Sequence, residues 1–310
     1  MQMSNVTLTN PGISFVTGVP ISCETGLLIL SIDELSFDKE PHSLLVVKNH
    51  KVTRGILVPS NCCDVISARE NGNVNGYFLG EDGAVWFYNG ETIEESEPII
   101  SNKNFGALRT QAFSPCSNHI AAGGGSTAFI KTTTSTWNDL EIQMDQEIEK
   151  FKYIGFEKIL AVPNGNFYLF GWHGVGIILS DKHCTRLHLP TNLDIYDAVQ
   201  AENGLIYTCG DHGTILRGQG IYDWSIVSNE ITDDKLWGIC SFNNKVFVCS
   251  MSFIYEIIDD ELRFIDFSDV SVVPSFTYKL RTCKDCAWSI GSKQLVQYDG
   301  SDWQELILLS

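Results

Sequence analysis

The sequence predicts an all-β fold, a β-propeller of about seven four-stranded blades, with six blades as the alternative count. Three observations predict it. A sequence repeat of short strands and tight turns recurs along the chain, and its period is close to 40 residues. Within each repeat, apolar residues alternate with polar ones or run for about five residues at a time. Four short strands at a spacing of roughly 40–50 residues are typical of propeller blades.

The clearest copy of the repeat covers residues 204–227, where Gly residues stand at the corners and Trp224 opens the last strand. Each unit has a small residue at the end of its second strand: Gly80, Gly123, Gly171, Gly210, Ser250 and Gly291. Successive anchors are 43, 48, 39, 40 and 41 residues apart. A helical repeat would need apolar residues at 3.6 spacing over ten or more positions, and these short runs rich in Val, Ile, Phe, Tyr and Trp favour strands instead.

Six units are predicted at 61–101, 102–145, 150–192, 193–231, 232–270 and 271–310. The first strands are predicted at 64–68, 107–113, 158–162, 196–200, 236–242 and 277–283, and the third strands at 84–88, 127–131, 175–179, 214–218, 253–257 and 293–298. Trp137, Trp224 and Trp303 open a fourth strand in three units. The charged stretch 138–152 is compatible with a short helix, but we favour a strand that begins at Trp137.

Residues 1–60 are predicted to supply the first blade and a closure strand, so that 1–310 forms a single propeller domain. Gly and Pro residues separate five strand-like segments, as turns require; these segments are 6–9, 13–16, 27–31, 43–47 and 52–58. Four of them complete a blade. We expect the fifth to pair elsewhere, and the last blade is the candidate because pairing there would close the ring and remove an open edge.

Two sequence segments resemble those of known propeller families. Gly210-x-x-Gly213-Thr-Ile-Leu-Arg217, followed by Asp223-Trp224, resembles the blades of BNR-type propellers such as the photosystem-assembly-factor family. Tyr298-Asp299-Gly300-Ser301-Asp302-Trp303 resembles a degenerate Asp-box of the sialidase-like propellers, although the usual Ser ahead of the box Asp is missing. The resemblance implies a propeller fold, and fold does not by itself imply function.

The charge of the chain is strongly one-sided, with 21 basic and 38 acidic residues and a formal net charge of −17. Such a surface repels phosphate backbones and anionic lipids, so we expect neither nucleic acid nor a membrane as a direct partner. It suits electrostatic steering of a basic protein partner, although net acidity also serves solubility alone. We expect the free protein to be a monomer.

The first residues contain no basic segment followed by an apolar one, so we expect no secretory signal. Ten cysteines are present, and several lie inside predicted apolar strands, where cysteine behaves as a small buried hydrophobe. Without a signal, the thiols are expected to be reduced and the protein cytoplasmic.

Partner-binding residues are expected on the turns between second and third strands, which share one face of a propeller with the connections between blades. Three turns carry bulky or charged side chains: Glu81 and Asp82, Trp172 and His173, and Asp211 and His212. The ordinary explanation for Asp is the tight turn itself. For Trp172, packing against a neighbouring blade is the alternative to binding.

No cofactor, metal or catalytic residue is predicted. Cys283-Lys-Asp-Cys286 is a lone CxxC motif, whereas a structural zinc needs four ligands. A sialidase-like hydrolase needs an arginine cluster, and Arg109 and Arg281 are the arginines placed within predicted channel-lining strands. No nucleophile elbow, phosphate loop or paired-histidine motif is present.

Three hypotheses follow. The first is a non-catalytic binding protein that presents an acidic face to a partner, in one version an immunity-type inhibitor of a basic toxin such as a nuclease. The second is a glycan-binding or glycoside-hydrolysing propeller, suggested by the Asp-box resemblance. The third is an assembly factor, implied by the family that the blades resemble. We favour the first.

Overall fold

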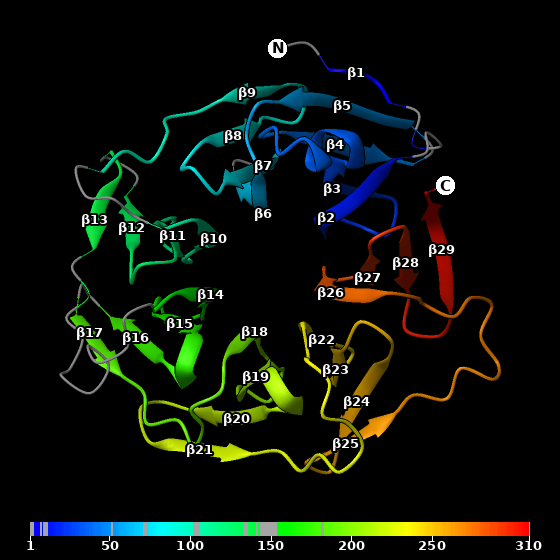
Figure 1. The fold of residues 1–310 in the computed structure, drawn as a ribbon. Coiled ribbons are helices and arrows are strands. Elements are labelled where there is room, and N and C mark those ends of the chain that lie inside the picture. The colour runs from blue at the N-terminus through cyan, green and yellow to red at the C-terminus, as the bar shows by residue number, and fades with distance from the viewer. Residues whose placement is uncertain are drawn as a thin grey trace. The chain divides into compact units, whose positions relative to one another are not determined.

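The computed structural model confirms the predicted all-β fold: it is a β-propeller of seven antiparallel four-stranded blades, and the first blade carries one extra strand. The alternative of six blades is therefore wrong. The structure describes residues 3–6, 8, 12–50, 52–70, 73–101, 106–132, 136–140, 142, 154–180 and 183–309. Figure 1 labels the strands, which follow one another in chain order across every blade except the first.

Most strands of the first three blades overlap the predicted segments. The predicted strand 6–9 is the exception, because residues 6 and 8 are outside any strand, residues 7 and 9 lie outside the described residues, and the N-terminal strand is at 4–5. The first blade holds β1 (Ser4–Asn5), β2 (Ile13–Pro20), β3 (Thr25–Ile32), β4 (Ser43–Asn49) and β5 (Val52–Val58). The second blade holds β6 (Cys62–Glu70), β7 (Asn73–Gly80), β8 (Val85–Tyr88) and β9 (Ile93–Glu95). The third blade holds β10 (Leu108–Phe113), β11 (His119–Gly123), β12 (Ala128–Lys131) and β13 (Asn138–Leu140).

The remaining blades repeat the same pattern. The fourth holds β14 (Phe156–Ala161), β15 (Phe167–Gly171), β16 (Gly176–Ser180) and β17 (His183–Arg186), and the fifth holds β18 (Ile195–Gln200), β19 (Ile206–Gly210), β20 (Ile215–Gln219) and β21 (Asp223–Ile226). The sixth holds β22 (Gly238–Phe242), β23 (Lys245–Cys249), β24 (Ile254–Ile258) and β25 (Glu261–Phe264), and the seventh holds β26 (Thr277–Thr282), β27 (Ala287–Gly291), β28 (Gln294–Tyr298) and β29 (Trp303–Leu308).

Helical structure within the described ranges is confined to α1 (Asp33–Phe37) and two 3-10 turns, η1 (Trp172–Gly174) and η2 (Asp211–Gly213). The sequence did not predict α1. The strand predicted from Trp137 is confirmed as β13, and the rest of that charged stretch, 141 and 143–152, lies outside the described residues.

The chain divides into two compact units. The first unit comprises Met1–Glu97, Cys249–Tyr255 and Phe264–Ser310, and the second comprises Pro98–Val248 and Glu256–Arg263. The first unit therefore contains the first, second and seventh blades, and the second contains the third, fourth and fifth.

The anchor glycines of the repeat are required by close backbone approach. A Cβ on Gly171 would lie 1.8 Å from the carbonyl oxygen of Gly155, and one on Gly210 would lie 2.0 Å from the carbonyl oxygen of Asp194. In both cases the crowding backbone belongs to the segment that enters the first strand of the same blade. The periodic glycine is thus a consequence of how tightly that segment crosses the end of the second strand.

A β-bulge recurs at the start of the first strand of most blades. The register skips Arg109 in β10, Glu157 in β14 and Tyr196 in β18, because the residues on either side of each pair with consecutive residues of the next strand. Bulges re-aim the side chain of the extra residue. All three skipped residues belong to the candidate site described below.

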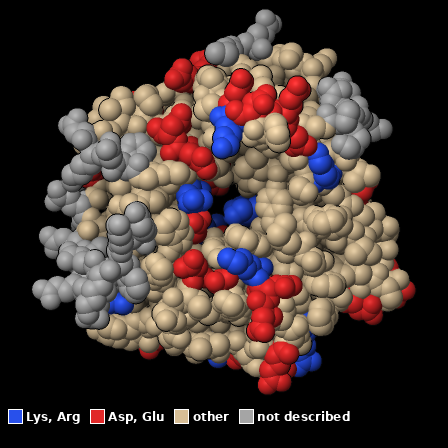
Figure 2. All heavy atoms as spheres, in the orientation of Figure 1, with Lys and Arg blue, Asp and Glu red and all other residues tan. Residues whose placement is uncertain are grey.

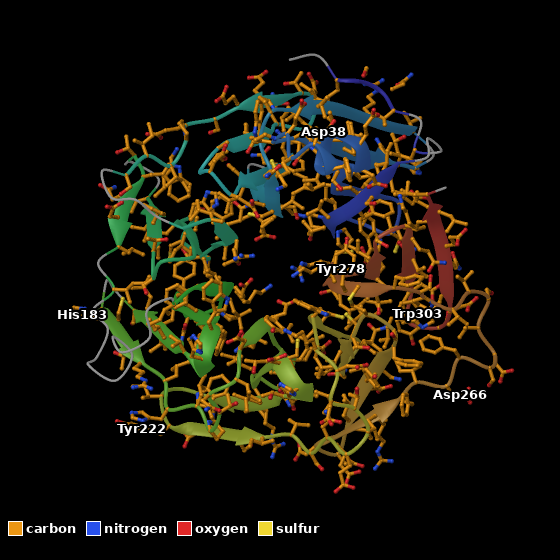
Figure 3. The ribbon with its side chains drawn as sticks, in the orientation of Figure 1. Asp38, His183, Tyr222, Asp266, Tyr278 and Trp303 are labelled. Carbon is orange, nitrogen blue, oxygen red and sulfur yellow. The ribbon has the colours of Figure 1, made fainter. Side chains whose placement is uncertain are left out.

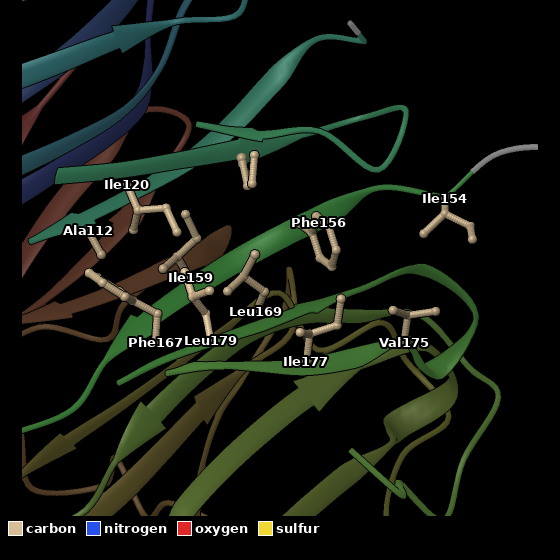
Figure 4. Close-up of a cluster of buried hydrophobic side chains, with 12 residues drawn as sticks. Ala112, Ile120, Ile154, Phe156, Ile159, Phe167, Leu169, Val175, Ile177 and Leu179 are labelled. Atoms are coloured by element: carbon tan, nitrogen blue, oxygen red, sulfur yellow. The ribbon is translucent and has the colours of Figure 1, made fainter. Parts of the chain in front are cut away.

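Apolar side chains pack between neighbouring blades, and Figure 4 shows this for the third and fourth blades. Ile120 of β11, Phe156 of β14 and Leu169 of β15 are wholly or almost wholly excluded from solvent. Burying one such side chain contributes about 1.5–3 kcal/mol. Because each blade buries one face against the next, the repeat is stable only as an array.

The extra N-terminal strand does not pair with the last blade as expected, and this prediction is wrong. Ser4 and Asn5 of β1 pair instead with Gly55 and Arg54 of β5, so β1 extends the first blade on the side away from β2.

Within the first unit, the first and seventh blades are joined by other contacts. The Phe15 N–H donates to the Ser292 carbonyl oxygen at 2.8 Å, and the hydroxyl of Tyr278 (Figure 3) donates to the Phe15 carbonyl oxygen. The indole of Trp288, fully excluded from solvent, packs so closely on Gly26 that a Cβ there would lie 2.1 Å from the ring. Among the described residues of this unit, no strand pairs across the two blades, which are joined by packing, by these hydrogen bonds and by the Lys293–Asp33 ion pair at 3.0 Å.

Candidate partner-binding site

The turns between second and third strands lie beside the connections between blades, as the sequence analysis expected. In the second unit, the Trp172 N–H donates to the Gly155 carbonyl oxygen at 3.0 Å, and the Asp211 N–H donates to the Asp194 carbonyl oxygen at 2.8 Å. The turns at 172–174 and 211–213 and the connections that precede β14 and β18 therefore form one surface of this unit.

Trp172 is held by a charged pair from two blades. Its indole Nε1 donates to Glu157 Oε1 at 2.7 Å, and Arg109 Nε lies 3.3 Å from the same oxygen. The Arg109 guanidinium also lies 5.9 Å from the centre of the Trp172 ring, within reach of a cation–π interaction. Trp172 is half-buried over Gly155, so packing against the neighbouring blade explains its presence as well as binding does.

A second aromatic–cation cluster lies at the fifth blade and the connection that follows it. The rings of Tyr196 and Trp237 stack with centroids 4.6 Å apart, and Lys235 Nζ lies 5.6 Å from the Tyr196 ring and 3.4 Å from Asp211 Oδ1. Lys235 also donates to the Tyr196 hydroxyl at 3.2 Å, which raises the pKa of the lysine. Asp211 is thus paired with a cation and is not a free negative charge.

His173 and His212 occupy the same position in two equivalent turns. Both have positive φ, 58° and 48°, in the left-handed region that His tolerates better than most side chains. The His173 N–H donates to Asp194 Oδ1 at 2.8 Å, and the His212 imidazole is exposed, with Nε2 3.8 Å from Asp211 Oδ2. Both imidazoles can therefore meet a partner, and turn geometry accounts for part of the choice of residue.

Glu81 and Asp82 lie in the first unit, between β7 and β8. Asp82 Oδ1 accepts hydrogen bonds from the Ser60 hydroxyl at 2.9 Å and the Ala84 N–H at 3.1 Å. Its carboxylate therefore stabilises the turn, which is the ordinary explanation that the sequence left open. Glu81 is half-buried, and its N–H donates to the Asn61 carbonyl oxygen.

An exposed apolar patch in the first unit was missed by the sequence analysis. It consists of Met251, Phe253, Phe264 and Phe276, which are 52%, 52%, 58% and 65% exposed. The rings of Phe253 and Phe264 meet nearly edge-on with centroids 5.8 Å apart, above the buried ring of Tyr255. The Thr277 hydroxyl, next to Phe276, donates to the Ser250 carbonyl oxygen at 2.8 Å and joins the two segments of the patch.

The apolar patch has the features of a protein-binding surface. Large aromatic side chains that stay exposed together are uncommon on a monomer and enriched at interfaces. Phe276 has φ of 52°, a strained conformation for a bulky side chain, and such strain concentrates at functional sites. A signal was present in the sequence: where other units have Asp-His-Gly or Trp-His-Gly, this turn has Met-Ser-Phe.

Acidic residues accompany this patch. The connection from Phe264 to Phe276 carries Asp266 and Asp269, both exposed, and Figure 3 shows Asp266 projecting from it. Hydrogen bonds from Ser268 lower the pKa of Asp266, so its carboxylate is charged at neutral pH. On the face seen in Figure 2, acidic side chains are spread among fewer basic ones.

A groove of about 810 Å³ lies between the fourth and fifth blades in the second unit, lined by Asn164, Tyr168, Gln200, Tyr222 and Asp223 among others. These residues flank turns after first and third strands, so the groove lies at the opposite end of the blades from the 172–174 turn. None of the residues predicted for the site contributes to it.

Metal-ligating side chains and the two arginines of the predicted channel-lining strands are the remaining candidates for chemistry. Over the residues that the structure describes, no cluster of three or more His, Cys, Asp or Glu side chains could hold a metal ion. Arg109 is committed to Glu157 and Trp172, and Arg281 Nη1 donates to the Leu280 carbonyl oxygen at 3.0 Å. None of the helices in the described part of the chain has the length and apolar character of a membrane-spanning helix.

Comparison with known proteins shows structures of the same fold and a relative with a described role. No protein-family model matches this sequence. The chain is 25% identical over 231 residues to the protein described as immune protein Tsi7 of Pseudomonas aeruginosa, a match that covers 74% of each chain.

Solved structures with the same fold have diverse roles. A catalytically inactive virginiamycin B lyase of Staphylococcus aureus with quinupristin matches at TM-score 0.69 and 10% identity, over 97% of both chains. YCF48 bound to D1 peptide matches at TM-score 0.65 and 12% identity, over 96% of this chain and 95% of that one. These likenesses confirm the propeller fold, which hosts both an enzyme and a peptide-binding protein.

Proposed function

We propose that this protein is a non-catalytic binding propeller of the immunity type, which neutralises a toxin protein by covering part of its surface. The observation that carries the proposal is the similarity to an immune protein over three quarters of both chains. The exposed apolar patch, which a folded monomer has no need to display, supports a protein as the partner.

The apolar patch is the surface that would supply most of the binding energy. Aromatic side chains such as Phe253 and Phe264 desolvate a large area at low entropic cost, and a few such residues dominate most interfaces. Asp266 and Asp269 at its border, together with the net charge of −17, favour a basic partner and would accelerate its approach. The partner is therefore a protein surface with an apolar centre and basic residues around it.

Trp172, His173, Asp211 and His212 are proposed as a second contact surface, carried by the second unit. Their side chains are exposed or half-buried on one surface of that unit. Because Trp172 and Asp211 are already engaged with Glu157 and Lys235, they would present a rigid surface, which lowers the entropic cost of association. Glu81 and Asp82 remain predicted partner contacts. Because they also form hydrogen bonds that stabilise their own turn, we expect them to contribute less to the binding energy than the other residues.

The test is affinity co-purification from the native cell extract, with washes at low and then high salt and mass spectrometry of the eluate. Retention of one basic protein in stoichiometric amount, released at high salt, is the expected result, because exposed charges are screened as the Debye length falls from about 10 Å at 0.1 M to about 3 Å at 1 M salt.

A matched pair of variants separates the patch from general surface effects. Phe253→Ser removes the central ring of the patch, and Phe37→Ser removes an equally large side chain that is 87% exposed on α1. Partner retention should fall with the first variant and persist with the second. Equal retention by both would refute the patch as the binding surface, and enzymatic turnover of the partner would refute the non-catalytic role.

Three finer predictions accompany the proposal. Sedimentation of the free protein should report a monomer, cell fractionation should find it in the cytoplasm, and the 298–303 turn is proposed as a degenerate Asp-box. In that turn, Asp299 Oδ1 accepts from the N–H groups of Ser301 and Asp302 at 2.8 and 3.0 Å, so the carboxylate organises the hairpin.

A further inference from the structure

Three cysteines from the two ends of the chain come together in the first unit. Cys283 and Cys286 flank the turn between β26 and β27, with Sγ atoms 3.5 Å apart and no disulfide between them. Cys23, in the turn between β2 and β3, donates from Sγ to the carbonyl oxygen of Asp285 at 3.4 Å. A CxxC motif that was isolated in the sequence thus acquires a third thiol from the first blade.

The environments of the two CxxC thiols differ in the way that a reactive pair requires. Cys286 is fully buried and Cys283 is half-buried, so only the latter is accessible to a small reagent. The thiol of Cys286 donates to Cys283, and the N–H groups of Asp285 and Cys286 add to this, which lowers the pKa of Cys283 to about 6. The hydrogen bond to Cys283 and burial raise the pKa of Cys286.

Charged groups near the pair act on the two thiols differently. The Lys48 ammonium, on β4, lies close enough to Cys286 for their charges to interact, and its Nζ is fixed by the carbonyl oxygens of Glu24 and His50 at 3.0 and 3.3 Å. The Asp285 carboxyl opposes thiolate formation, but it contributes less than the hydrogen bonds that Cys283 accepts. The cation therefore lies beside the resolving thiol, whereas Cys283 has hydrogen-bond donors within a Cys-X-X-Cys motif, a setting typical of reactive cysteines.

We propose that Cys283 and Cys286 form a redox site that takes hydroperoxides, with Cys283 as the attacking thiolate and Cys286 as the resolving thiol. The half-exposure of Cys283, the 3.5 Å between the two sulfurs and the converging donors carry this inference. It is independent of the function proposed above. Cysteines inside the strands, such as Cys209 and Cys249, are fully buried and serve as packing groups.

The chemistry proceeds in two steps. The Cys283 thiolate attacks one oxygen of the hydroperoxide, an S–O bond forms, the O–O bond breaks, and the leaving alkoxide or hydroxide takes a proton, which leaves a sulfenic acid. Cys286 then loses its proton and attacks the Cys283 sulfur, an S–S bond forms, and the S–O bond breaks with release of water. Two thiols are oxidised by two electrons while the hydroperoxide is reduced to an alcohol, or to water in the case of hydrogen peroxide.

The first experiment uses the reduced full chain and needs no variant. Alkylation by iodoacetamide is followed by peptide mass spectrometry between pH 5 and 8.5, and the exposed Cys116 serves as the internal reference. Cys283 should react with a midpoint near pH 6 and, at pH 6, roughly tenfold faster than an ordinary thiol of pKa about 8.5, after its lower nucleophilicity is taken into account. Reaction in step with Cys116 would overturn the proposal.

The second experiment identifies the bond. Hydrogen peroxide should lower the mass of the chain by two hydrogens and join Cys283 to Cys286, and a dithiol should reverse the change. Cys286→Ser should leave a sulfenic acid on Cys283 that dimedone traps, whereas Cys283→Ser should give neither product. A bond from Cys23 to either partner, or oxidation that begins at Cys116, would overturn the assignment, and Cys116→Ser is the matched control.

Discussion

Acidification is predicted to destabilise the fold through one buried histidine. His119 of β11 is almost completely buried, with Nε2 2.8 Å from Gln111 Oε1 and its ring 4.2 Å from the Phe113 ring and 4.8 Å from the Trp137 ring. Burial, with a smaller effect of Lys131, lowers the pKa of His119 to about 3. The imidazole is therefore neutral in the folded protein at every pH above that value.

The sign of the effect follows from where the proton binds. In the unfolded chain a histidine has a pKa of about 6.5, so between pH 6.5 and 3 the unfolded state binds the proton and the folded state does not. The free energy of unfolding should therefore fall as the pH falls through this window. At pH 5 the loss is about 2 kcal/mol, from 1.5 pH units at 1.36 kcal/mol per unit, and the loss levels off below pH 3.

Denaturant unfolding of the native chain and of His119→Gln, each at pH 8 and pH 5, measures this contribution. The native chain should lose about 2 kcal/mol more than the variant between the two pH values. His212→Gln, at an exposed imidazole, should behave as the native chain does. Equal losses for the native chain and His119→Gln would show that the folded state accepts the proton, and would refute the reasoning.

Three further predictions concern an ion pair between Lys158 and the buried Asp197, the contact of Gly26 with Trp288, and the apolar patch. Lys158→Met should lower the free energy of unfolding in the denaturant assay by about 3–5 kcal/mol, because the wholly buried Asp197, 2.9 Å away, loses its cation. Adding Asp197→Asn should restore part of that loss in the same assay. Gly26→Ala should cost about 1–3 kcal/mol in thermal unfolding, since the new methyl meets the Trp288 ring, and an unchanged Tm would mean that the contact is loose. Phe253→Ser should weaken partner binding by at least about 2 kcal/mol, roughly thirtyfold, in calorimetry, with the Tm of the free protein unchanged.

Strand positions were predictable because their signals are local. The anchors Gly80, Gly123, Gly171, Gly210 and Gly291 each end the second strand of a blade, as predicted. The exception, Ser250, follows β23 directly and begins the turn that carries the apolar patch. Serine in place of glycine at that anchor indicated an unusual turn. That the turn contributes to an apolar patch could be seen only from its neighbours in the structure.

The candidate site was predictable only in outline. The sequence placed Trp172 and Asp211 at turns on one face, and the structure agrees. Their partners Glu157 and Lys235 are 15 and 24 positions away, and nothing in the residue pattern pairs them. The bulge at Glu157 decides that pairing, because it turns a side chain of an inner strand toward the indole.

The sequence by itself determined the fold class, the period and the positions of most strands, since alternation, turn residues and repeat length act over a few residues and need no knowledge of the fold. Only the tertiary structure decided the contacts between segments that lie far apart in the chain. Thr110 accepts the Ile159 N–H from 49 positions away, β1 joins β5 instead of the last blade, and Cys23 meets a motif more than 250 positions further along the chain. Such contacts depend on blade geometry and bulges, because partners far apart in the chain become neighbours only after every intervening strand has paired.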